Sequence, residues 1–149
     1  MSNSNHDVLS RTEKISVALL IIVGLVVSIR GTYWITNYQA AVHESVFYEA
    51  LDKVAPLYIW GAPFVIGGLF LILSSLLIIN QSAKKKFDIF IIIGGTVSGF
   101  SFLLIAMASM NNSINWLTPA LNVIFTVGFF TLSWIGINSL WKNRADKKN

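Results

Sequence analysis

The sequence predicts an all-α, polytopic membrane protein with four transmembrane helices arranged as two hairpins, plus a short amphipathic helix on the outer side. Of the 149 residues, 54% are hydrophobic and only 12% are charged, whereas about 25% of the residues in an ordinary soluble domain are charged. The apolar residues also gather in long uninterrupted stretches. A soluble fold of this length could not bury so much apolar surface, so solvation by lipid is the better explanation.

Four stretches are long enough to cross a bilayer, which takes about 20 residues. Runs such as 69–73 are continuously apolar and lack the alternation of membrane barrel strands, so they indicate helices. We expect one transmembrane domain over residues 1–149, a four-helix bundle with helices at about 15–35, 58–79, 87–110 and 117–140.

The positive charges predict the orientation of these helices. Nine of the 11 Lys and Arg residues lie before the first stretch, between the second and third, or after the fourth. Arg30 lies within the first stretch, and Lys53 lies between the first and second. By the positive-inside rule, the chain is a multi-pass protein of the cell membrane with both termini cytoplasmic. The lysines would then meet anionic headgroups of the lipid bilayer, so the basic charge requires no nucleic-acid partner.

Aromatic residues agree with this orientation. Trp and Tyr favour the headgroup level, because their rings are apolar while their N–H or O–H groups need water. Trp141 falls at the inner end of the fourth stretch. At the outer ends lie Tyr33, Trp34, Tyr58, Trp60 and Trp116.

An amphipathic helix is predicted at about 40–54, before Pro56. At about 100° per residue, one face holds Val42, Val46, Phe47, Ala50, Leu51 and Val54. The opposite face holds Glu44, Ser45, Tyr48, Glu49 and Asp52. This polar face lacks the Lys and Arg of lipid-binding helices, so the pattern favours capping of the bundle or docking of a partner.

Arg30 is the one charge in the interior of a predicted span, five residues before Ile35. An Arg at that depth can extend its side chain to the lipid phosphates. Alternatively, it can pair with a carboxylate of a partner protein or of this chain. The candidate intramembrane ion pair joins Arg30 to Glu44, Glu49 or Asp52.

Small residues indicate helix-packing faces. The candidates are Gly24 and Ser28 in the first span and Gly95 and Gly99 in the third, each pair at spacing four. Such residues let helix backbones approach closely in lipid. Packing within the chain and a homo-oligomer seam both fit this pattern.

The two predicted hairpins show a weak resemblance to each other. Residues 21–28 resemble residues 91–98, and both outer helix entrances carry Trp-x-x-Pro. A duplication would superpose Gly24 on Gly94 and Trp60 on Trp116 by rotation about the membrane normal.

The residues available for chemistry are few. The chain has no Cys and two His, and no catalytic, cofactor-binding or metal-binding residues are predicted. Uncharged interiors in the second to fourth spans disfavour ion-coupled transport. We expect a small accessory, assembly or immunity-type partner of other membrane proteins, not an enzyme. Alternatives are a holin-like pore-forming protein and a small-solute transporter. Heavy use of Ile, Asn and Lys suggests a bacterial or phage gene.

Overall fold

The computed structural model describes residues 10–44, 46–78, 83–112 and 115–145, and within them all regular secondary structure is helical. The four long helices are each long and apolar enough to cross a membrane. The all-α class and the four membrane-length helices are therefore confirmed. The helices are α1 (Arg11–Thr36), α2 (Tyr38–His43), α3 (Val46–Val54), α4 (Leu57–Leu77), α5 (Lys84–Asn112) and α6 (Leu117–Ala145).

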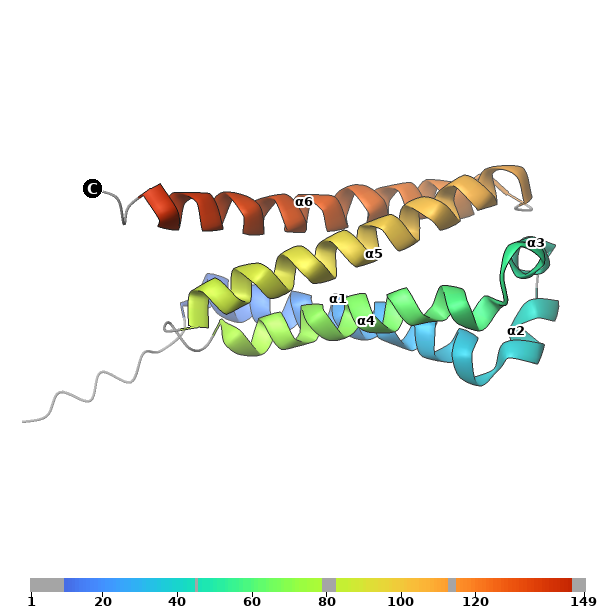
Figure 1. The fold of residues 1–149 in the computed structure, drawn as a ribbon, viewed down its shortest axis with the longest axis horizontal. Helices are drawn as coiled ribbons and strands as arrows, with labels where there is room; N and C mark the ends of the chain where they lie inside the picture. Colours follow the sequence, from blue (N-terminus) through green and yellow to red (C-terminus); the bar gives the residue numbers. More distant parts are fainter. Residues whose placement is uncertain (1–9, 45, 79–82, 113–114, 146–149) are drawn as a thin grey trace, which may run out of the picture.

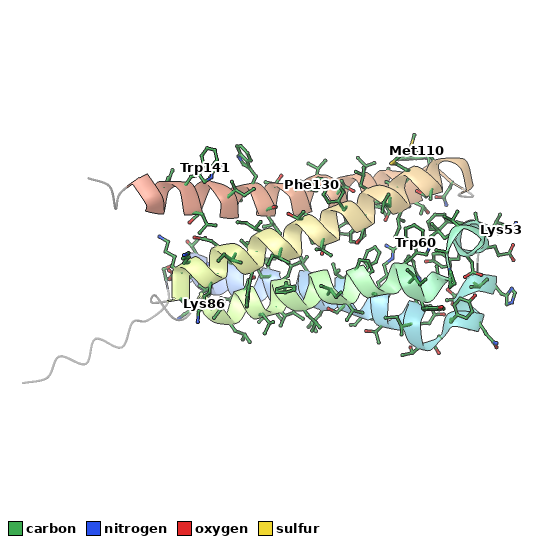
Figure 2. The ribbon with its side chains drawn as sticks, in the orientation of Figure 1. Lys53, Trp60, Lys86, Met110, Phe130 and Trp141 are labelled. Atoms are coloured by element: carbon green, nitrogen blue, oxygen red, sulfur yellow. The ribbon has the colours of Figure 1, made fainter. Side chains whose placement is uncertain are left out.

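The long helices run side by side along the length of the molecule (Figure 1). Close packing joins α1 to α4, α4 to α5 and α5 to α6, so each long helix packs on the long helix before it. The described part of the chain thus forms a row rather than a closed bundle. The start of α1, the end of α6 and Lys86 lie at one end, while α2, α3 and Lys53 lie at the other (Figures 1 and 2).

α1 begins four residues before the predicted boundary because a capping box starts it. The Ser10 backbone N–H donates to Glu13 Oε2 at 2.7 Å, and the Glu13 N–H donates to Ser10 Oγ at 3.2 Å. This reciprocal pair satisfies two backbone donors that a helix start leaves open. The signal Ser-x-x-Glu was present in the sequence.

The predicted outer helix at 40–54 is divided into two short helices, α2 and α3. Phe47 and Leu51 are buried, as the pattern predicts, but Val46 and Val54 are 64% and 77% exposed. Tyr48, which the pattern places on the polar face, packs against the core instead. α3 therefore buries fewer of its predicted apolar residues, and its buried face includes Tyr48. The reason is that the 40–54 segment is not one continuous helix.

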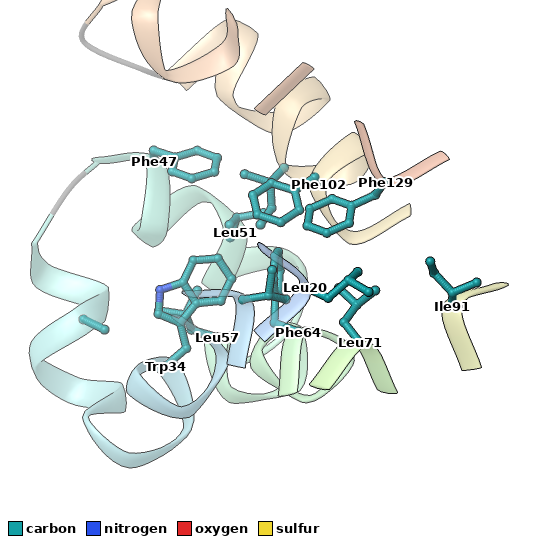
Figure 3. Packing of buried hydrophobic residues seen from close by; sticks show 13 residues of the cluster. Leu20, Trp34, Phe47, Leu51, Leu57, Phe64, Leu71, Ile91, Phe102 and Phe129 are labelled. Carbon is teal, nitrogen blue, oxygen red and sulfur yellow. The ribbon is translucent and has the colours of Figure 1, made fainter. Parts of the chain in front are cut away.

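Trp34 was predicted to lie at the membrane interface, and this prediction is wrong. It is 1% exposed and lies in the core between α1, α3 and α4 (Figure 3). The reason is helical register: Trp34 continues the buried stripe of α1, which comprises Leu20, Gly24, Val27 and Gly31. Trp116 and Trp141, by contrast, are exposed near the two ends of α6, as an interface position requires.

The proposed superposition of the two hairpins is wrong. A Cβ at Gly24 would meet Gly68 and Ile72 of α4, its own hairpin partner. A Cβ at Gly94 would also meet α4, at Gly67 and Leu71, rather than its hairpin partner α6. The two glycines therefore occupy different faces of their hairpins, and the sequence likeness reflects the shared composition of close-packed membrane helices.

Candidate functional site

Arg30 turns into the protein rather than out to the lipid. Its guanidinium carbon lies over the rings of Trp34, Phe64 and Phe102, at 5.2, 5.6 and 5.4 Å from their centroids. These rings come from α1, α4 and α5 and are each at most 2% exposed. We call Arg30 with these three rings the Arg30 ring cluster. The side chain therefore lies among protein rings and does not extend along the lipid-facing surface toward the headgroups, as the first interpretation of the sequence expected.

The rings of the cluster pack against one another across α1, α4 and α5. Phe64 meets Trp34 and Phe102 edge-on, with centroid distances of 5.5 and 5.0 Å. Phe102 also stacks on Phe129 of α6, with ring centroids 5.3 Å apart, and Figure 3 shows the two rings side by side. All four long helices therefore support the cluster. A cation over an aromatic face gains about 0.5–1 kcal/mol where exposed and about 2 kcal/mol where water is excluded.

Tyr48 joins the cluster from the end of the molecule that carries α2 and α3 (Figure 1). Its ring packs edge-on against Trp34 at 5.3 Å, and its hydroxyl forms a hydrogen bond with the Arg30 side chain. Because Tyr48 belongs to α3, this short helix is coupled directly to Arg30 of α1. The α2–α3 segment thus covers the end of the cluster that is nearest to the end of α1.

The three carboxylates proposed as partners of Arg30 contact other groups. Glu44 accepts a hydrogen bond from the Tyr33 hydroxyl, and Glu49 lies 3.9 Å from His43 Nδ1. Asp52 accepts hydrogen bonds from Tyr38 and Leu57. In the described part of the chain these contacts do not include Arg30, so none of the three acids pairs with it.

Asp52 of α3 forms hydrogen bonds with α2 and with α4; we call α2 and α3 together the cap. Its Oδ2 accepts from the Tyr38 hydroxyl at 3.0 Å, and its Oδ1 accepts from the Leu57 backbone N–H at 2.8 Å. The second bond satisfies an open donor at the start of α4. The first raises the pKa of Tyr38, because Asp52 stabilises the protonated phenol and repels the phenolate. The acids that sequence reasoning assigned to Arg30 therefore organise the cap.

The predicted helix-packing residues lie at contacts within the chain. Gly24 and Ser28 of α1 meet α4 at Gly68, where a Cβ would contact the Ser28 hydroxyl. A Cβ at Gly95 would meet the Phe129 carbonyl oxygen at 2.8 Å, and one at Gly99 would meet the Phe130 ring at 2.9 Å, both on α6. These residues position the helices that carry the ring cluster.

Asp88 is a buried polar residue near the start of α5, beside the lysines that precede the third predicted span. It is 2% exposed and accepts a hydrogen bond from Ser139 Oγ of α6 at 2.9 Å. Gly136 permits this approach, since a Cβ there would meet the Asp88 carbonyl oxygen at 3.0 Å. The available signal was spacing: Asp88 lies two helical turns, seven residues, before Gly95 and so shares its packing face.

Within the described residues, no group of three His, Cys, Asp or Glu side chains could hold a metal ion. The arrangement offers instead an inward-facing cation, aromatic faces and a hydroxyl. These groups can bind an anion or fix a helix arrangement. No protein-family model matches the chain, and no curated protein or solved structure matches it significantly.

Proposed function

We propose that this small integral membrane protein is an accessory partner, of the assembly or immunity type, that binds another membrane protein through the outward face of α6. This face, the α6 outer stripe, follows the three-and-four spacing of a helix-pairing seam. All of its members are exposed. They are Leu121, Ile124, Gly128, Thr131 and Ile135.

Gly128 is the observation that carries the proposal. A Cβ at Gly128 would meet nothing within 4 Å, whereas a Cβ at each of the other nine glycines would meet atoms of the protein. A glycine inside a helix costs about 0.5–1 kcal/mol relative to alanine. At the other nine positions close packing accounts for that cost. A helix from another protein docking at Gly128 accounts for it in the same way.

The opposite face of α6 is a helix-pairing seam that is occupied within the chain, by α5. A second, buried stripe faces α5 and combines one aromatic residue with small or polar ones; it comprises Asn122, Thr126, Phe129, Ser133 and Gly136. α6 therefore carries packing residues on two faces, of which the chain itself uses one. The exposed stripe of α1 is different in kind, since its residues Leu19, Ile22, Val26 and Ile29 are all large and aliphatic.

Site-specific photo-cross-linking in the native membrane tests the proposal, with a matched control in the same chain. The photoreactive residue replaces Ile124 on the α6 outer stripe or Ile29 on α1. Both isoleucines are 65% exposed, and each lies seven residues from the outer end of its helix, about 10 Å deep. We expect a discrete adduct with another membrane protein from position 124 and none from position 29.

A second variant tests whether the adduct depends on the small residue. Gly128→Leu should abolish the adduct, because the added side chain keeps a docking helix away, while Val127→Leu beside the stripe should preserve it. Equal adducts from both cross-linking positions, or adducts insensitive to Gly128→Leu, would contradict the proposal. An adduct made only of two copies of this chain would replace the accessory role with homo-oligomerisation.

A further inference from the structure

We propose that the Arg30 ring cluster is a binding site for a phosphate oxyanion, supplied by the headgroup of a phospholipid. The site lies in the outer half of the protein and does not depend on the α6 outer stripe. It assigns a ligand to the one cation in the interior of a membrane-spanning helix of the described chain.

The positive charge of Arg30 is not balanced by an acid in the described part of the chain. Each of the five described acids has a different contact. The partners of the acids are, in chain order, Ser10 for Glu13, Tyr33 for Glu44, His43 for Glu49, Tyr38 and Leu57 for Asp52, and Ser139 for Asp88. Since a charge inside the bilayer is costly unless it is paired, an anion from outside the chain would stabilise this arrangement.

The guanidinium also has more donors than its surroundings have acceptors. It carries five N–H donors; the Tyr48 hydroxyl supplies one acceptor oxygen, and the three aromatic faces supply none. Arg30 as a whole is partly exposed rather than buried, so the residue keeps surface outside its contacts with the three rings.

Phosphate matches this site in geometry and in depth. The planar guanidinium binds phosphate oxygens through two parallel N–H···O bonds, which a point charge such as Lys cannot reproduce. Arg30 lies six residues before Thr36, about 9 Å from the outer end of α1. Arg residues at such depths draw headgroups and water inward by thinning the bilayer locally. A phospholipid headgroup is therefore the source of phosphate nearest to the cluster.

The experiment measures ligand-induced thermal stabilisation and native mass spectra of the full chain in maltoside detergent, which contains no phosphate. Three probes are added separately: phosphatidylglycerol, a galactolipid with the same acyl chains, and inorganic phosphate at matched ionic strength. The variants are Arg30→Gln and Arg30→Lys. The control is Arg11→Gln, which removes an exposed cation at the opposite end of α1.

We expect phosphatidylglycerol to stabilise the wild type and Arg11→Gln, and to remain bound in the mass spectrometer, while the galactolipid does neither. Arg30→Gln should lower the affinity for the phospholipid by about ten- to a hundredfold, the usual effect of losing hydrogen bonds to a charged group. If that variant does not fold, Arg30→Lys keeps the charge and should still bind more weakly than the wild type.

Stabilisation by inorganic phosphate that also requires Arg30 would support the oxyanion site with a soluble source. Equal stabilisation by the phospholipid and the galactolipid would overturn the proposal. So would unchanged phospholipid affinity in both Arg30 variants, because binding would then depend on the acyl chains or on other cations.

Discussion

A single methyl group added at Gly31 should destabilise the protein, although alanine is the better helix former. Gly31 of α1 and Gly61 of α4 face each other at a close contact between the backbones of these helices. A Cβ at Gly31 would lie 2.5 Å from the Gly61 carbonyl oxygen and 2.8 Å from the Val65 backbone nitrogen. Neither atom can move without its helix, so Gly31→Ala must push α1 and α4 apart.

The size of the effect follows from two opposing terms. Replacing a glycine inside a helix with alanine gains up to about 1 kcal/mol. Overpacking a close contact costs about 1–3 kcal/mol, and the upper part of that range applies here because the obstructing atoms are backbone. The net expectation for Gly31→Ala is a loss of about 1–2 kcal/mol in the free energy of unfolding.

Gly128→Ala is the matched control, since its Cβ would meet nothing within 4 Å. It should gain up to about 1 kcal/mol, so the two variants should differ by about 2–3 kcal/mol, or roughly 4–12 °C in Tm. Thermal unfolding of the purified chain in detergent, followed by helical circular dichroism, measures this difference. A Gly31→Ala protein as stable as Gly128→Ala would refute the close approach of α1 and α4.

Three further outcomes are expected. Ser139→Ala removes the hydroxyl that donates to a buried carboxylate of α5, and thermal unfolding should show a loss of about 1–3 kcal/mol; unchanged stability would mean that this bond is not formed. The pKa of Tyr38 is raised in the folded protein, so its hydrogen bond to Asp52 contributes its full stabilisation below pH 10.0, the ordinary pKa of tyrosine. This stabilisation is lost as the pH rises through the higher pKa of the folded state. Unfolding measured as a function of pH should therefore show a loss of stability at alkaline pH that is absent from Tyr38→Phe. In this Cys-free chain, Cys introduced at Val54 should react with an impermeant thiol reagent from outside the cell and Cys at Lys86 should not; the reverse pattern would invert the predicted orientation.

The sequence predicted the elements that depend on composition and length. Membrane-length helices follow from continuous apolar runs, because a lipid environment imposes the same requirement along each whole segment. Gly24 and Gly95 were likewise singled out by the spacing of small residues, which reflects how closely helices approach; a Cβ at Gly24 would meet α4 and a Cβ at Gly95 would meet α6.

The sequence did not predict features that depend on which way a side chain turns. Arg30 can reach either headgroups or the protein interior from the same backbone position, and only the rings of α4 and α5 decide between them. Trp34 shows the same difficulty. Its place near the end of a span fits the membrane surface, but its side chain lies on the helix face that points into the core, where it is 1% exposed. The burial of Asp88 was not predicted, because the sequence does not show that Ser139 of α6 lies within hydrogen-bonding distance of it.

The row-like order of the long helices has a consequence for synthesis. Because α4 packs on α1, α5 on α4 and α6 on α5, every newly inserted helix finds its docking surface already in the membrane. Such pairing between long helices that follow one another in the chain favours rapid assembly. The ribosome thus delivers these long helices in the order in which they pack.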